Sequence, residues 1–178
     1  MMIKSLPLSE VYRLLEPGPV VLVATADKNK NNVMTMSWHT MMEFEPPLIG
    51  CVISGRNHTF DTLLKTKECV IGIPTAKMID KVVKIGNCSG RDTDKFKKIG
   101  LTPLPASRVK APLVKECYAN IECKISDANL VGKYNFFILK AVKAWIDPKA
   151  KNPKIIHHGG KGNFTISDKA VKIASKMK

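Results

Sequence analysis

Hydrophobic residues gather along this chain in short runs that have the length of β-strands. Apolar runs rich in β-branched residues cover 19–26, 48–53 and 68–73. Two further stretches, 116–126 and 134–146, alternate between apolar and polar residues or stay broadly apolar. Runs of this length, bounded by turn residues, predict strands that are buried on one or both faces.

The segment that follows the polar turn at 27–32 alternates strictly. Its apolar side chains occupy every second position, at Met34, Met36 and Trp38. The positions between them carry polar groups, at Thr35, Ser37 and His39. Because successive side chains of a strand point to opposite faces, the pattern predicts one strand over 34–39 whose apolar side chains face a core.

Helical spacing predicts three short amphipathic helices in the interior of the chain, over 59–66, 76–85 and 92–99. Gly86 and Gly100 follow the second and the third as helix stops. Two more helices are predicted near the ends of the chain, one over 9–15 and one after the Ser167-Asp168 pair, because serine and aspartate are good N-caps.

About six strands at hairpin-like intervals, with short helices inserted, favour a mainly β architecture. They predict a small antiparallel barrel rather than a parallel sheet built from βαβ units. The segment 101–112 contains three prolines and is predicted to be a loop. A length of 178 residues suits a single domain over 1–178, which hides roughly 70% of the surface of its unfolded chain.

The chain is strongly basic, with 29 lysines and arginines against 15 acidic residues and a net charge of +14. Such a charge raises nucleic acid or an anionic ligand as a partner. The lysines are spread along the chain, however, and no helix-turn-helix, zinc-finger or RNA-binding aromatic motif accompanies them. We therefore expect a solvated, lysine-rich surface and no nucleic-acid partner.

Cysteine usage and the absence of long apolar runs indicate the compartment. The five cysteines are odd in number and form no Cys-x-x-Cys pair, and three of them lie in apolar runs, at Cys51, Cys69 and Cys123. Free thiols fit a reducing compartment, and the spacing does not suit a zinc or iron–sulfur site. No apolar run approaches the ~20 residues that span a bilayer, and the first residues lack the pattern of a signal peptide. We expect a cytoplasmic protein without a membrane partner.

The tripeptide Ser-Gly-Arg occurs twice, at 54–56 and at 89–91, although the chain has only four arginines. A hydroxyl donor, a glycine that admits close backbone approach and a planar guanidinium together suit a phosphate group. Each copy also precedes a predicted helix start, where backbone N–H groups favour anions. The alternative is two ordinary loops capped by small polar residues.

Three segments, 33–38, 46–59 and 86–96, resemble the flavoredoxin and flavin-reductase-like family in their order and spacing. They contain the motifs Met-Thr-Met-Ser-Trp, Pro-Pro-Leu-Ile followed by Ser-Gly-Arg-Asn-His-Thr, and Ser-Gly-Arg-Asp-Thr-Asp-Lys-Phe. The resemblance covers roughly residues 15–165. It implies a split β-barrel that binds FMN and works as a homodimer.

The resemblance also implies which residues contact the cofactor. They are Thr35, Met36, Ser37, Trp38, Ser54, Gly55, Arg56, Asn57, Thr59, Ser89, Gly90 and Lys95. Residues 35–38 would line the isoalloxazine ring, the 54–59 segment would hold the phosphate, and Lys95 would add a cation. Arg91 would pair with Asp92 or Asp94 instead, and an exposed position on a helix is the alternative for Lys95.

Residues near the C-terminus extend the implied site. His157, Gly159 and Phe164 match a His and Gly pattern that family members carry near the flavin, and His157 would help to bind a nicotinamide donor. An ordinary loop is the alternative, and His157-His158 alone does not make a metal site. The chain departs from the family after Trp38, at His39 and at Met41-Met42, where relatives more often have aromatic or small residues.

The implied activity is electron transfer from NAD(P)H or a redox protein through bound FMN to an acceptor. This is an oxidoreductase of the NAD(P)H:flavin or ferric/acceptor reductase type, with no essential catalytic side chain and no metal. A non-enzymatic FMN electron carrier is the main alternative. A basic nucleic-acid-binding module and a split barrel acting on vitamin B6 phosphates are less favoured.

Overall fold

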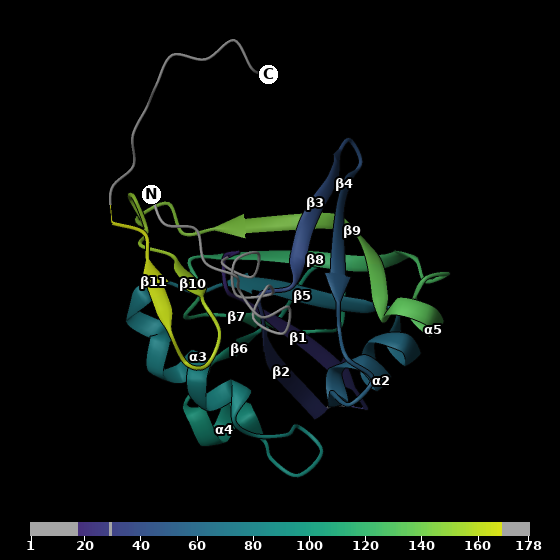
Figure 1. Cartoon of the computed structure of the whole chain (residues 1–178), viewed down its shortest axis with the longest axis horizontal. Coiled ribbons are helices and arrows are strands. Elements are labelled where there is room, and N and C mark those ends of the chain that lie inside the picture. Colours follow the sequence, from purple (N-terminus) through teal and green to yellow (C-terminus); the bar gives the residue numbers. More distant parts are fainter. Residues whose placement is uncertain (1–17, 29, 169–178) are drawn as a thin grey trace, which may run out of the picture.

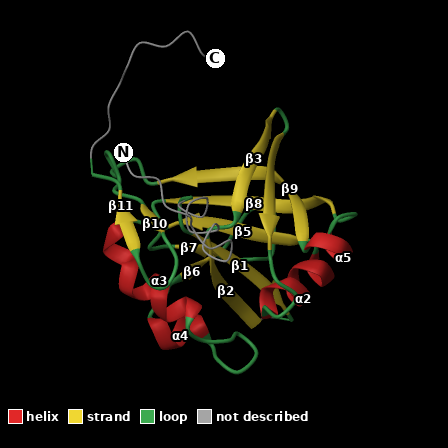
Figure 2. Cartoon of the chain, viewed as in Figure 1, coloured by secondary structure: helices red, strands yellow, loops and turns green. Residues whose placement is uncertain are grey.

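A computed structural model describes residues 18–28 and 30–168 of the chain. Seven strands form one antiparallel sheet in the order β2-β1-β5-β8-β9-β4-β3 (Figure 1). They are β1 (Val21–Asp27), β2 (Lys30–Met36), β3 (His39–Phe44), β4 (Pro47–Val52), β5 (Glu68–Ile73), β8 (Ala119–Asp127) and β9 (Phe136–Ile146). The described part is therefore mainly β with inserted helices, as predicted, and the strongly curved sheet is a split barrel (Figure 2).

The remaining elements are short and connect the strands of the large sheet or, for the last two, follow it in the chain. Two strand pairs stand apart from it, β6 (Pro103–Leu104) with β7 (Leu113–Val114) and β10 (Ile156–His158) with β11 (Phe164–Ile166). The helices are α2 (His58–Thr66), the 3-10 turn η2 (Ala76–Met78), α3 (Ile79–Gly86), α4 (Lys95–Ile99) and α5 (Val131–Tyr134). No helix of the described part is long and apolar enough to cross a membrane.

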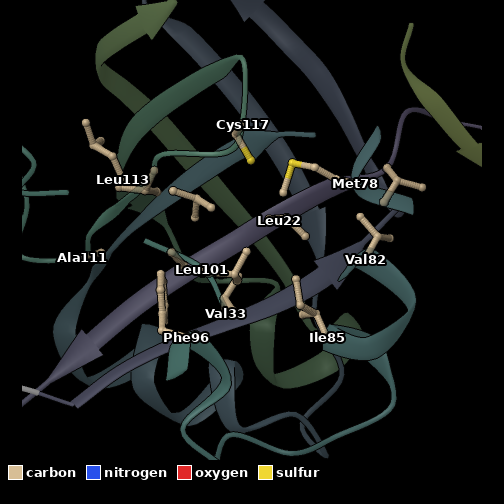
Figure 3. Close-up of a cluster of buried hydrophobic side chains, with 14 of the residues drawn as sticks. Leu22, Val33, Met78, Val82, Ile85, Phe96, Leu101, Ala111, Leu113 and Cys117 are labelled. Carbon is tan, nitrogen blue, oxygen red and sulfur yellow. The ribbon is translucent and has the colours of Figure 1, made fainter. Parts of the chain in front are cut away.

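Two hydrophobic clusters explain why the β1 segment is apolar at nearly every position. Val21 and Val23 face one cluster, which fills the curved sheet together with Phe137 and Leu139 of β9. Leu22 faces the other cluster, which lies under α3, α4 and the 101–114 segment (Figure 3). A strand that is buried on both faces loses the polar half of its alternation.

The cluster that Leu22 faces holds α3 and α4 against β2. Its members come from the strands, the helices and the long loop, and they include Leu22, Val33, Val82, Ile85, Phe96, Leu101 and Leu113 (Figure 3). Burying each of the larger side chains stabilises the fold by about 1.5–3 kcal/mol. This packing places α3 and α4 beside β2.

The predicted strand over 34–39 is wrong in its second half. β2 ends at Met36, Ser37 and Trp38 belong to no strand, and β3 begins at His39 at the opposite edge of the sheet. Met36 does join the cluster inside the curved sheet, but Trp38 is 52% exposed instead of facing a core. Trp38 lines a surface cleft, which explains why an apolar residue stands at this exposed position.

Other sequence predictions are met to different degrees. The four cysteines Cys51, Cys69, Cys117 and Cys123 are buried, and all five thiols are free. The strands β3, β6, β7, β10 and β11 and the helix α5 were not predicted, and the helix predicted over 92–99 begins only at Lys95. The helices predicted over 9–15 and after Asp168 lie outside the described residues.

Candidate functional site

Two adjoining cavities form one cleft at the end of β2. The larger, of about 620 Å³, is mainly apolar. The smaller, of about 300 Å³, is mainly polar. They share Met34, Asn57, Gly86 and Asn87. A ligand with a flat apolar head and a polar tail would match this division.

The apolar cavity lies against β2, the residues that follow it and α3. Its apolar wall includes Val20, Met34, Trp38, Val82, Val83 and Phe164. One edge is polar, because Thr35, Ser37 and Ser54 also line it. The Thr35 hydroxyl donates to the carbonyl oxygen of Val82 at 2.8 Å, which fixes α3 against β2.

Both Ser-Gly-Arg segments meet at the polar cavity, although 35 residues separate them in the chain. We call 54–56 the first turn and 89–91 the second turn. In each, the serine hydroxyl accepts from the arginine backbone N–H, at 3.3 Å for Ser54 and 3.1 Å for Ser89. The first turn leads into α2 and the second precedes α4. The repeat is therefore one local structure used on both sides of a single cavity.

Lys95 is the most unusual side chain of the polar cavity. It is only 5% exposed, and its Nζ donates to the carbonyl oxygen of Ile85 at 2.9 Å. Burial lowers the pKa of Lys95 below its ordinary value. Among the described residues it forms no ion pair with a carboxylate. A buried cation without a countercharge is costly, so an anion in this cavity would be strongly favoured.

Neighbouring cations make the whole cavity electropositive. Burial, followed by the charges of Lys30 and Arg91, lowers the pKa of His58 below its ordinary value. Arg56 reaches the same cavity from the first turn and is exposed. The site is thus suited to an anion and needs no proton on His58 to hold one.

Asn32 is a further residue of the site, although the sequence pattern predicts that it lies in a polar turn. It is 2% exposed and lies in β2 at the floor of the polar cavity. Its amide nitrogen donates to the Thr59 hydroxyl at 2.9 Å, while its amide oxygen has no donor among the described residues. The sequence offered one signal. Asn32 stands two positions before Met34, on the same face of the strand if the strand is extended backwards.

The cleft contains most of the predicted cofactor residues. Those lining it are Thr35, Met36, Ser37, Trp38, Ser54, Arg56, Asn57, Thr59, Ser89, Gly90 and Lys95. Gly55 is the exposed middle residue of the first turn and does not line either cavity. His157 does not line them either, whereas His158 does, with its ring packed at 5.1 Å on that of Phe164.

The structure excludes one alternative and overturns one expectation. Lys95 is buried at the polar cavity, so the alternative of an exposed helix lysine does not hold. The expected partners of Arg91 are wrong: it pairs with Asp61, at 2.9 Å, and not with Asp92 or Asp94. Asp94 instead caps α4 by accepting from the backbone N–H of Lys97. Asp61 comes from a distant part of the chain, which local spacing does not specify.

The departures from the family after Trp38 lie on an edge strand. His39 is half-buried, and its Nε2 lies 2.8 Å from the carbonyl oxygen of Pro19. Met41 and Met42 are exposed on β3. In the described chain no three His, Cys, Asp or Glu side chains are grouped closely enough to hold a metal ion.

Comparisons with known proteins agree with this geometry. The family model of the flavin reductase like domain matches residues 13–165. An uncharacterized protein of Pyrococcus abyssi (strain GE5 / Orsay) is 35% identical over 133 residues, which cover 75% of this chain and 76% of the relative.

Solved structures share the fold across almost the whole chain. The FMN-binding domain of a flavin reductases-like enzyme from Shewanella baltica OS155 is 25% identical, with a TM-score of 0.82, and covers 96% of this chain and 97% of that one. Flavoredoxin of Desulfovibrio vulgaris (Miyazaki F) is 24% identical, with a TM-score of 0.86 and 98% coverage of both chains. The family resemblance that the motifs indicate is confirmed.

Proposed function

Because the chain belongs to the flavin reductase-like domain family, we propose that it is an oxidoreductase that holds FMN in the cleft at the end of β2. The phosphate would occupy the polar cavity and the isoalloxazine ring the apolar one. The observation that carries this proposal is Lys95, a buried cation at the wall of the polar cavity that has no carboxylate partner among the residues the structure describes.

The donors around the polar cavity fit a phosphate dianion. Lys95 and Arg56 supply charge, and Thr59 and Ser89 supply hydroxyl groups. Charge-assisted hydrogen bonds contribute about 1.5–3 kcal/mol each, so three or four of them outweigh the cost of desolvating the phosphate. The amide oxygen of Asn32, which has no donor in the described part of the chain, would accept from a hydroxyl of the ribityl chain.

The residues of the apolar cavity would position the ring and exclude water from it. Val82, Val83 and Phe164 offer apolar surface, while Thr35 and Ser37 offer hydroxyls at the polar edge. When bound, FMN supplies the chemistry of electron transfer, so the site needs no general base of its own. We propose NAD(P)H or a redox protein as the electron donor, with His157 or its neighbour His158 beside the nicotinamide.

The five free thiols support a reducing, cytoplasmic location. We also propose that the protein is a homodimer. The supporting observation is an apolar surface on the β3–β4 hairpin, at the edge of the sheet, where Met41, Met42 and Phe44 are exposed.

The cofactor assignment is tested by Arg56→Ala, with titration of apoprotein by FMN and by riboflavin. We expect FMN to bind about tenfold more weakly, or worse, because the phosphate loses a charged donor. Riboflavin, which has no phosphate, should bind equally to both proteins. Arg108→Ala removes an exposed arginine that does not line the cleft and should leave FMN binding unchanged.

A colourless protein that does not take up FMN, or an unchanged FMN affinity in Arg56→Ala, would contradict this assignment. The carrier alternative shares the site and differs in turnover. In a reductase, anaerobic NADH or NADPH should bleach the flavin at least as fast as the enzyme turns over. The flavin of a carrier should stay oxidised until a reduced redox protein is added.

A further inference from the structure

Arg91 is the last residue of the second turn, and its side chain reaches the first turn. Its Nη1 donates to the carbonyl oxygen of Arg56 at 2.8 Å, and its Nη2 donates to the carboxylate of Asp61 at 2.9 Å. Asp61 lies near the start of α2, and α2 begins two residues after Arg56, the last residue of the first turn. In the described chain both hydrogen bonds that join these two segments come from Arg91.

The guanidinium of Arg91 is committed to these acceptors and not to the cavity, since Arg91 does not line it. The backbone of Arg91 is fixed as well, because Lys30 of β2 donates to its carbonyl oxygen at 3.3 Å. Arg91 therefore links three segments: β2, the second turn and the start of α2. The planar fork of a guanidinium can serve two separated acceptors at once, which a lysine ammonium does less well.

The geometry points to Arg91 as a positioning residue that clamps the two Ser-Gly-Arg turns together and so sets the width of the phosphate cavity. This inference rests on the proposed FMN site. Donors from both turns surround that cavity, among them Arg56, Thr59, Ser89 and Lys95. Surface turns without such a link move more freely. FMN binding would then bear the entropic cost of ordering them.

A purely electrostatic role for the same ion pair predicts the opposite result at Asp61. Asp61 is an acidic group close to the place of an anionic ligand. If charge alone mattered, its removal would tighten FMN binding. If Arg91 is a clamp, removal of Asp61 weakens FMN binding, because Arg91 loses one of its two acceptors.

The test compares FMN and riboflavin affinities of Asp61→Ala, Asp61→Asn and Asp92→Ala by fluorescence titration. Asp61→Asn removes the charge and keeps an acceptor oxygen for Arg91. Asp92→Ala removes a carboxylate next to Arg91 and leaves the clamp intact.

Exposed ion pairs contribute little, so we expect the FMN Kd to rise about two- to fivefold in Asp61→Ala. Asp61→Asn should stay close to the wild-type value, and Asp92→Ala should bind FMN as well as the wild type or slightly better. Riboflavin affinity should not change in any of the three variants.

Equal or tighter FMN binding by Asp61→Ala overturns the clamp. So does an equal loss in Asp61→Asn, or a parallel loss of riboflavin affinity that marks general damage to the fold. Arg91→Lys is a second test, because it keeps the charge and should still lose FMN affinity to the same degree as Asp61→Ala. A wild-type protein that binds no FMN overturns the cofactor proposal and the clamp together, which separates that failure from failure of the clamp alone.

Discussion

Gly90 lies so close to β2 that the second turn has no room for a side chain at this position. A Cβ atom there would stand 2.0 Å from the amide oxygen of Asn32 and 3.0 Å from Cδ2 of His58. Asn32 is buried and is held by its hydrogen bond to Thr59, so it cannot move aside without breaking that bond. The glycine of the second turn is therefore required by the close approach of two site segments.

Gly90→Ala should consequently lower the free energy of unfolding by about 1–3 kcal/mol, as expected for overpacking, and should also weaken FMN binding. Urea denaturation of the apoprotein measures the first effect. Gly132→Ala is the matched control, because nothing lies within 4 Å of a Cβ at that position of α5. Alanine is up to about 1 kcal/mol better than glycine in a helix, so this variant should be as stable as the wild type or more stable. Equal losses in both variants would contradict the close approach at Gly90.

At the scale of elements, one buried carboxylate attaches the 101–112 loop to the sheet. Glu122 of β8 is fully buried and accepts hydrogen bonds from the backbone N–H groups of Ser107 and Arg108. The Trp145 indole of β9 donates to it as well, at 2.7 Å. Burial raises the pKa of Glu122, but the hydrogen bonds outweigh this effect and leave the pKa below its ordinary value. The folded state therefore favours the ionised form.

This carboxylate predicts a loss of stability in acid. A depressed pKa stabilises the fold above the unfolded value of about 4.3, and this contribution disappears as the pH falls through the lower folded pKa. Glu122→Gln should lose stability at neutral pH, by about 1–3 kcal/mol for each buried donor left without an acceptor, and should show a flatter acid dependence. Glu116→Gln changes a less buried carboxylate that binds the backbone of Thr102 and should have a smaller effect. Parallel acid profiles for the wild type and Glu122→Gln, from thermal unfolding between about pH 7 and pH 3, would contradict this role.

The elements that the sequence predicts well are those whose pattern is set by burial. β4, β5, β9, α2 and α3 lie within a few residues of their predicted positions, because each has at least one face in a hydrophobic cluster. β3 was not predicted, since most of its side chains are exposed. β6 and β7 were not predicted either, because they are two-residue strands, one inside the proline-rich segment 101–112 and one directly after it.

The same contrast applies to the site. The Ser-Gly-Arg repeat and the segment 35–38 were identified from local motifs, and the fold brings them into one cleft. The partner of Arg91, the burial of Lys95 and the role of Asn32 depend on contacts between segments that are 10 to 61 residues apart. Local spacing carries no information on such contacts, because they are fixed by how the helices pack on the sheet.

At the scale of the whole molecule, the β3–β4 hairpin projects beyond the rest of the sheet (Figure 1). β3 is an edge strand, and large apolar side chains are exposed along it, with Phe44 at 84% exposure near the tip. An apolar edge strand favours association, since it offers both unpaired backbone groups and surface to bury. A second copy of the chain is the partner that we propose for it.

Sedimentation velocity tests this assembly. The wild type should sediment as a dimer, and Phe44→Glu should shift the population towards monomer, because a carboxylate would be buried in the interface without a partner. Leu104→Glu is the control: Leu104 is an exposed leucine on β6, outside the large sheet, and its replacement should leave the dimer intact. A monomeric wild type, or a dimer that Phe44→Glu does not weaken, would place the association elsewhere or remove it. If the dimer is present, FMN titration of Phe44→Glu also shows whether the cleft depends on assembly. Trp38 lines the cleft and directly precedes β3. A loss of FMN affinity together with loss of the dimer would therefore show that the cofactor site depends on the dimer interface.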